Sequence, residues 1–303
     1  MTSNVLIVYY SQSGQLKEII DKTTVALLQD AEINLSTYKI EMEEEFPFPW
    51  DFYSFFNAFP DSFLQKPHKI KPIPADILNQ KYDLILMYYQ VWFLSPSIPI
   101  NSFIQNQEAK QLLNGSRIVT ISGTRNMWFL AQEKIKVLLK TNQAKLVGNI
   151  ALVDHTPNLI SAITIVNWMF SGVKKKMFNF LPFPGISKKT IDESERFGNI
   201  LLHSIKQNEY KNLQQNLIDA DAVVVKPFLV SVDTKGNRMF KIWSKIIDPK
   251  QGNQRKKFLK LFYYYLIFAI WIISPLVNLL YYIFYPFNFL KYKKQIKYYQ
   301  GIE

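Results

Sequence analysis

The order of hydrophobic and polar positions in the first half of the chain predicts strands that alternate with helices. Residues 5–10 form an unbroken apolar run, typical of a strand covered on both faces. After a short polar loop, apolar residues recur at helical spacing from residue 16 to residue 27. Further strands are predicted at residues 33–40, 83–89, 117–122 and 146–153, and helices at 100–113 and 129–140. This order predicts an α/β fold, a doubly wound five-stranded parallel sheet with a ligand crevice at the carboxyl ends of its strands.

Residues 41–80 interrupt this alternation as a long insert rich in aromatic residues. The insert opens with four glutamates and continues through Phe46-Pro47-Phe48-Pro49-Trp50 to further phenylalanines as far as Phe63. So many rings argue against disorder, and long connections of this kind are usually functional. Two interpretations stay open. The rings pack the insert onto the sheet, or they form a lid that lines an apolar substrate cleft.

The chain beyond the last predicted strand divides into several parts. Residues 160–183 place the basic triplet Lys174-Lys175-Lys176 among aromatic residues, which fits a helix on a membrane surface or an ordinary surface helix. Residues 190–207 predict the closing helix of the sheet. Residues 222–232 and 239–243 are predicted as two strands joined by a turn. We therefore divide the chain into a domain at 1–210, an appendage or linker at 211–255 and a tail at 256–303.

The tail contains a 30-residue stretch, residues 261–290, without a single charge. As a straight helix it would be about 45 Å long, whereas the hydrocarbon core of a bilayer is about 30 Å thick. Pro275 is predicted to divide it into two pieces, each too short to span. Three arrangements stay open: a re-entrant or interfacial helical hairpin, a single tilted and kinked span, and a hydrophobic arm buried in a dimer.

Charge and composition favour lipid as the partner of this tail. Residues 250–303 hold nine basic residues and one acidic residue, which leaves them +8 of the total net charge of +12. Because the basic residues bracket the uncharged stretch, we expect a membrane rather than a nucleic acid. The N-terminus lacks the basic leader of a secretory signal. We therefore expect the cytoplasmic face of the inner membrane, with the tail as the anchor.

Residue types exclude several kinds of chemistry. The chain has no cysteine, which excludes disulfides, thiolate catalysis and cysteine-ligated metals. Its three histidines lie far apart in sequence, and we expect no metal site. A polar loop between the first strand and the first helix remains as a candidate anion site, formed by Ser11, Gln12, Ser13, Gly14 and Gln15. Backbone N–H groups and the helix dipole favour a phosphate there.

Three segments resemble flavodoxins. Residues 5–15 resemble the flavodoxin phosphate loop, although Leu16 stands where that loop has a hydroxyl residue. Residues 83–103 and residues 122–128 resemble the two segments that meet the flavin ring. The resemblance implies a flavodoxin-like fold and FMN as cofactor. It implies that the phosphate lies on the loop at residues 11–15 and that the ring lies against Gln90, Val91, Trp92, Phe93, Gly123, Thr124, Arg125 and Asn126.

Candidate chemistry at the ring follows from residue types. Trp92 and Phe93 offer aromatic faces for stacking, although a core or lid role for Trp92 stays open as the lesser alternative. Arg125 would favour negative charge on a neighbouring flavin, or it is a solvated loop charge. His155 follows the fifth predicted strand at the crevice edge. We name it as a candidate general base because an unperturbed histidine titrates near neutral pH.

The whole chain resembles the bacterial dialkylresorcinol-condensing enzymes of aryl-polyene and flexirubin-type pigment clusters. The likeness lies in the start of the chain, Phe46 to Trp50, Val153 to Asn158 and the apolar basic tail. It implies an FMN-dependent aromatase that oxidises a dialkylcyclohexane-1,3-dione to a dialkylresorcinol, with a ketosynthase of the same pathway as a partner. Two alternatives stay open: a membrane-associated quinone reductase or electron carrier, and a flavin-free binding protein of the same fold.

Overall fold

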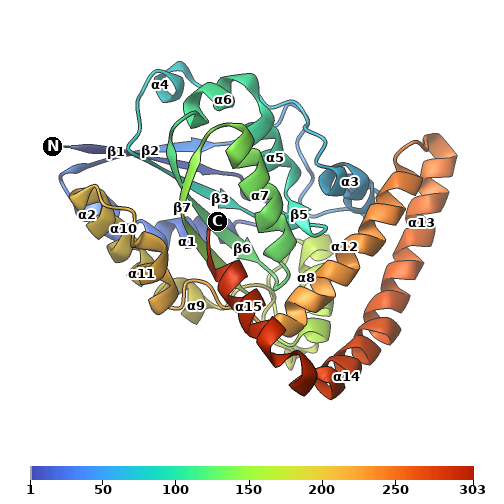
Figure 1. Cartoon of the computed structure of the whole chain (residues 1–303). Helices are drawn as coiled ribbons and strands as arrows, with labels where there is room; N and C mark the ends of the chain where they lie inside the picture. Colours follow the sequence, from blue (N-terminus) through green and yellow to red (C-terminus); the bar gives the residue numbers. More distant parts are fainter. Residues whose placement is uncertain (1) are drawn as a thin grey trace.

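A computed structural model describes residues 2–303 and contains a five-stranded parallel sheet (Figure 1). The strands are β1 (Ser3–Tyr9), β2 (Ile33–Lys39), β3 (Leu84–Tyr89), β6 (Arg117–Thr124) and β7 (Lys145–Val153). Their spatial order is β2-β1-β3-β6-β7. In sequence order of these five strands this is 2-1-3-4-5, the order of flavodoxin-like doubly wound folds. The predicted fold class is confirmed.

Alternation along each strand divides the core into two halves. On β1, Val5 and Ile7 belong to one buried cluster, whereas Leu6 and Val8 belong to another. Successive side chains of a strand point to opposite faces, so a run that is apolar throughout needs a hydrophobic layer on both sides. All six residues of β3, the central strand, are buried. The continuous apolar runs therefore mark the middle of the sheet.

Helices cover both faces of the sheet (Figure 1). The cluster on one face joins the strands to helices α1 (Gln15–Thr23), α2 (Val25–Gln29), α9 (Lys188–Glu193), α10 (Glu195–Gln207) and α11 (Leu213–Asp219). The cluster on the other face includes residues of α4 (Ala75–Leu78), α5 (Ile98–Gln105), α6 (Gln107–Leu113) and α7 (Phe129–Thr141). Helix α8 (Asn158–Ser171) follows β7, and a short hairpin, β4 (Val91–Trp92) and β5 (Ser95–Pro96), follows β3.

The aromatic insert forms helix α3 (Phe52–Leu64). Asp51 caps its N-terminus, because the carboxylate accepts hydrogen bonds from the amides of Tyr53 and Ser54. Its phenylalanines pack mainly against helices from the C-terminal part of the chain. Phe59 stacks on Phe262 with ring centroids 4.1 Å apart. The insert is therefore packed between the sheet and the tail.

Residues 227–243 are helical, and the predicted hairpin of two strands is wrong. Helix α12 (Pro227–Ile247) begins with a proline, which is favourable in the first turn. Its buried residues are Val230, Asp233, Phe240, Ser244 and Ile247, a helical face. Of the predicted strand, only a single bridge between Val223 and Ala151 of β7 is present. Helix α12, the longest element of the appendage, packs against α3 and α7.

Asp233 is fully buried where α12 meets the start of α7. Its carboxylate accepts a hydrogen bond of 3.1 Å from the Leu130 amide, one of the first amides of α7. Burial raises the pKa of Asp233 to about 7, and the nearby charge of Lys134 opposes part of that rise. Lys134 donates to the carbonyl of Phe63 and to Ser95, and burial lowers its pKa to about 8. Two buried titratable side chains therefore connect α3, α7 and α12.

Residues 252–284 form one long helix rather than two short pieces. Helix α13 (Gly252–Phe268), a π-helical turn (Ala269–Ile273) and α14 (Ser274–Phe284) run on without a break. Pro275 lacks an N–H and would clash with the carbonyl four residues earlier. The wider π turn directly before it accommodates the ring. The predicted division at Pro275 is therefore wrong, and helix α15 (Phe289–Gln300) returns to the sheet domain (Figure 1).

Candidate functional site

A cavity of about 610 Å³ lies at the carboxyl ends of β1, β3 and β6. The ends of these strands and the segments that follow them contribute Gln12, Ser13, Gln90, Trp92, Gly123 and Arg125 to its lining. Helices α3, α8, α12, α13 and α14 form the rest of the wall, mostly with apolar side chains. The volume is in the range of sites for small molecules and cofactors. The crevice that the order of strands predicted is thus present, and the C-terminal helices form part of its wall.

The loop between β1 and α1 has the properties of an anion site. Gly14 has φ of +87°, a conformation that a residue with a Cβ rarely adopts. No side chain caps α1, so its first amides keep their capacity to donate. The hydroxyl of Ser11 is buried and has no hydrogen-bond partner among the described residues. A buried orphan donor beside an uncapped helix N-terminus fits a phosphate.

The glutamines of this loop hold the loop in place. The Gln12 side chain accepts a hydrogen bond from the hydroxyl of Tyr10 and donates one to the carbonyl of Pro47 in the insert. The side-chain amide of Gln15 donates to the carbonyl of Ile186 at 2.9 Å and accepts from its backbone N–H at 3.0 Å. Both side chains are therefore occupied by hydrogen bonds to other groups of the same chain. Leu16 is buried and packs toward β6, so it supplies no substitute for the missing hydroxyl.

The hairpin after β3 has an unusual turn. Phe93 and Leu94 have φ of 49° and 58°, although such two-residue turns normally require glycine or asparagine. Strained residues of this kind persist where packing holds them, often at functional sites. Phe93 packs against Phe55 and Phe59, with ring centroids 5.1 and 5.4 Å apart. The turn is thus held by the insert and presents Phe93 to the cavity.

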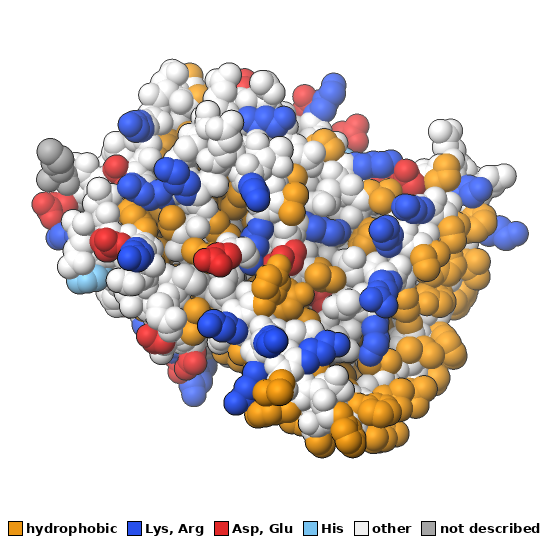
Figure 2. Space-filling view, viewed as in Figure 1, with side chains coloured by type: hydrophobic (Ala, Val, Ile, Leu, Met, Phe, Trp, Pro, Cys, Tyr) orange, Lys and Arg blue, Asp and Glu red, His pale blue; other side chains and the backbone are white. Residues whose placement is uncertain are grey.

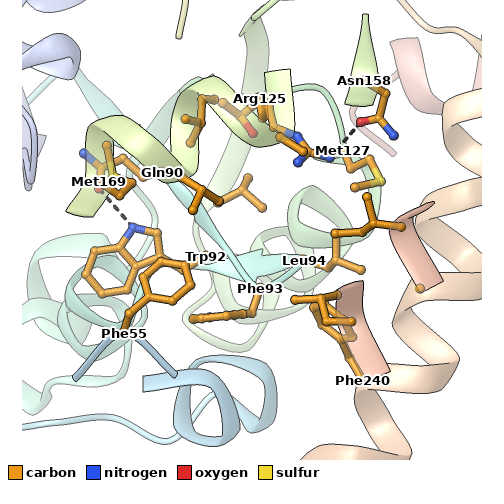
Figure 3. A pocket seen from close by; sticks show the side chains of 18 of the residues that line it. Phe55, Gln90, Trp92, Phe93, Leu94, Arg125, Met127, Asn158, Met169 and Phe240 are labelled. Carbon is orange, nitrogen blue, oxygen red and sulfur yellow. Dashed lines mark hydrogen bonds between the residues drawn. The ribbon is translucent and has the colours of Figure 1, made fainter. Parts of the chain in front are cut away.

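Trp92 and Phe55 both line the cavity (Figure 3). The indole N–H of Trp92 donates to Oε1 of Gln90 at 3.2 Å, and its ring meets Phe46 and Trp50 edge to face. Val91 lies in the same segment and also lines the cavity. The ring is therefore both a packing partner of the insert and part of the wall. Stacking of Trp92 on a flavin stays a prediction.

The loop after β6 places a positive charge at the cavity. Arg125 donates to Oδ1 of Asn158 at 2.7 Å (Figure 3). Burial lowers the pKa of Arg125 to about 10, which leaves the group charged at neutral pH, and the charge of Asp154 opposes part of that fall. Gly123 and Thr124 also line the cavity, whereas Asn126 is buried behind it and donates to the same Asn158 oxygen. Arg125 is suited to hold an anionic group or an electron-rich ring edge.

Comparisons with known proteins give matches among solved structures only. No family model matches the chain, and neither does any curated protein. A flavoprotein from Lactobacillus acidophilus NCFM, solved with FMN, is 19% identical, with 50% of this chain and 93% of that chain covered and a TM-score of 0.40. The flavodoxin of Megasphaera elsdenii is 13% identical, with 56% and 99% covered and a TM-score of 0.31. An oxidoreductase from Corynebacterium diphtheriae is 12% identical, with 69% and 98% covered and a TM-score of 0.34.

His155, the predicted general base, lies away from the cavity. Its side chain is exposed and is not among the residues that line the wall. The neighbouring Asp154 is committed, since its carboxylate accepts hydrogen bonds from Thr156 and Ser161. Tyr263 of α13 does line the cavity. The structure therefore brings the three predicted loops together and leaves the histidine outside.

The apolar wall contributed by the C-terminal helices was missed at the sequence level. Met239 and Phe240 of α12 line the cavity, as does a stripe along the long helix that consists of Tyr263, Leu266, Ile267, Ile270, Ile273, Ser274 and Val277. These positions recur every three or four residues, which is one face of a helix. The spacing of these positions can be read from the sequence. It does not stand out there, because nearly every residue of the segment is apolar.

Proposed function

We propose that the chain is a flavin-dependent oxidoreductase that takes FMN. The observation that carries this proposal is the loop at residues 11–15. Its uncapped helix start and the orphaned hydroxyl of Ser11 support a phosphate site there, and Gln12, Ser13 and Gln15 of the same segment line a large apolar cavity, whereas Ser11 and Gly14 do not. A phosphate held there would place the attached ring between the loops after β3 and β6, as in the general ligand geometry of doubly wound sheets.

Different residues near the cavity would hold different parts of FMN. The amides of the loop and Ser11 would hold the phosphate, and the segment from Gln90 to Phe93 would lie along the ring. Arg125 would stabilise negative charge at the ring edge. Bound FMN supplies the two-electron acceptor that no side chain can provide. The protein supplies position and a dry site.

The apolar wall supports a lipophilic substrate. In its finer form the proposal is the reaction implied by the resemblance to dialkylresorcinol-condensing enzymes. A dialkylcyclohexane-1,3-dione loses one hydride and one proton from its ring, and enolisation of the two ketones completes the resorcinol. Tyr263 lies on the wall, and as a phenolate it would be the group that takes the proton. A ketosynthase of the same pathway would deliver the dione.

A quinone reductase is the second candidate. The exposed position of His155 favours it, because reduction of a quinone needs no base to abstract a carbon-bound proton. The same cavity accommodates an alkylated quinone as readily as an alkylated dione.

The visible spectrum of the purified, detergent-solubilised chain tests both candidates. Under anaerobic conditions, a synthetic dialkylcyclohexane-1,3-dione should bleach the flavin band and yield the resorcinol. If the dione leaves the band unchanged, while a chemically reduced sample is reoxidised by a quinone, the second candidate holds. If the flavin-loaded chain responds to neither compound, a redox function is contradicted.

A further inference from the structure

The long helix from Gly252 to Phe284 presents two different apolar faces. Its inner face walls the cavity, as described above. Its outer face is exposed, with Phe268 at 52%, Trp271 at 42% and Leu279 at 58% exposure. In the most apolar window of 18 residues, 11% of the residues are buried. A helix that is apolar all round needs a second apolar partner on its outer face.

Both ends of this helix are tied to the same folded body. At its start, Arg255 donates to the side chain and the carbonyl of Asn57 in α3. Beyond its end, α15 is held to the sheet domain, because the carbonyl of Gln300 accepts a hydrogen bond from Gln214 at 2.7 Å and Tyr299 packs on Phe129. A helix of 33 residues is about 50 Å long. With α15 docked in this way, the helix cannot place its two ends on opposite sides of a bilayer.

Basic residues flank the exposed apolar face. Lys256, Lys257 and Lys260 lie in the first turns of α13, and Lys291, Lys293, Lys294 and Lys297 lie in α15. Figure 2 shows the hydrophobic side chains as a continuous band along the edge formed by α13 and α14, with blue basic side chains beside it. An amphipathic arrangement of basic and apolar groups suits the plane of an anionic membrane surface.

The cavity opens toward the same surface. Val166 of α8, Ile267 of α13 and Ile273 in the π turn each line the cavity and are also 48%, 40% and 38% exposed. They form an apolar rim between α8 and the long helix. In water, this rim would expose the interior of the cavity to solvent. In contact with acyl chains, it would let a lipophilic molecule pass from the lipid into the cavity.

We propose that the long helix lies in the plane of an anionic bilayer surface, with its outer face among the acyl chains, and that the cavity takes its lipophilic ligand directly from the lipid. The binding to membrane does not depend on flavin. The identity of the ligand as a redox substrate rests on the proposed function.

Vesicle binding of the full chain tests the charge part of this proposal. Replacing Lys256, Lys257 and Lys260 by glutamine should lower partitioning to vesicles of anionic phosphatidylserine and neutral phosphatidylcholine on the order of 100-fold, because each basic residue near such a surface adds to the attraction. The matched control replaces Lys39, Lys81 and Lys110, three exposed lysines of the sheet domain, and should leave partitioning unchanged. An equal loss in both triple variants, or unchanged binding in both, contradicts the proposal.

The absence of cysteine allows single labels to test the orientation. A fluorophore at Leu279→Cys should be quenched by brominated lipids, and one at Val137→Cys, equally apolar and 65% exposed on α7, should not. A membrane-impermeant maleimide should react with both Glu209→Cys and Lys297→Cys when the chain is bound to sealed vesicles. If Lys297→Cys is protected from the maleimide until detergent is added, the helix spans the bilayer. If Leu279→Cys is shielded in a dimer formed without vesicles, a second copy of the chain covers the outer face. Either result overturns the proposal, and a colourless chain that passes these tests contradicts only the flavin assignment.

Discussion

A substitution at Ser11 gives the most direct test of the proposed phosphate site at a single residue. Its hydroxyl is buried without a partner, and an unmet buried polar group costs stability. Ser11→Ala should therefore leave the free energy of unfolding of the flavin-free chain unchanged or raise it by up to about 1 kcal/mol. The same variant should bind FMN roughly 10-fold more weakly, because a hydrogen bond to a charged group is lost. Denaturant unfolding and flavin fluorescence titration measure the two effects, and a loss of stability with unchanged affinity would contradict the role.

Gly14 offers a matched pair with Gly115. Both have positive φ, and at neither would a Cβ meet another atom within 4 Å. A valine at either position should cost similar backbone strain, roughly 1–2 kcal/mol. Only Gly14→Val should abolish FMN retention, since only Gly14 lies in the phosphate loop. Equal flavin content in Gly14→Val and Gly115→Val would place the phosphate elsewhere.

For single residues, the sequence predicts where a side chain lies in the fold better than it predicts which group the side chain bonds to. Most of the residues named for flavin contact lie on the cavity wall, because the ends of parallel strands meet at one edge of a sheet. The commitment of Gln15 to Ile186 was not predictable, since the two lie 171 residues apart. The outward position of His155 depends equally on tertiary packing.

At the level of elements, the contact between α12 and α7 should make stability depend on pH. The pKa of Asp233 is raised to about 7 from an unfolded value of about 3.9, so protonated Asp233 favours the folded state. This contribution is complete below about pH 4 and is lost as the pH rises through about 7. Asp233→Asn keeps an acceptor for the Leu130 amide and does not titrate. Its free energy of unfolding relative to the parent should rise between pH 4 and 7, by on the order of 3 kcal/mol. A difference that is flat with pH would contradict the assignment.

Two elements escaped prediction for identifiable reasons. Residues 222–225 are β-branched or small and apolar, and Gly236 follows at the distance of a turn, so local preference indicates a hairpin. Packing of Phe240 and Ile247 against the aromatic insert overrides that preference. Pro275 normally marks the end of a helix, but a π turn accommodates it here. The strands of the sheet were predictable because their apolar runs are long and uninterrupted.

At the level of the whole molecule, three distant segments enclose one cavity. The phosphate loop, the aromatic insert and the C-terminal helices all contribute to its wall. Phe56, Phe59 and Phe63 pack against residues of α12 and α13 in one cluster. The tail at residues 256–303 is therefore structurally continuous with the site that the sheet domain carries.

Removal of residues 252–303 should consequently destabilise the chain. Phe59, which is fully buried, would lose its stacking partner Phe262, and the cavity would open to water. Loss of a large aromatic contact costs about 3–5 kcal/mol. We expect aggregation and increased binding of a hydrophobic dye, measured by gel filtration and fluorescence. A monomeric truncated chain with unchanged unfolding temperature would show instead that the tail is a separate unit.

Titration of the purified full chain with FMN tests whether the loop at residues 11–15 holds a flavin phosphate. The orphaned Ser11 hydroxyl and the uncapped start of α1 predict saturable binding at one site per chain, with a shift of the visible flavin band and competition by excess inorganic phosphate. Riboflavin, which lacks the phosphate, should bind far more weakly. If FMN and riboflavin bind equally, or neither binds, the loop at residues 11–15 is not a flavin phosphate site and the account is contradicted.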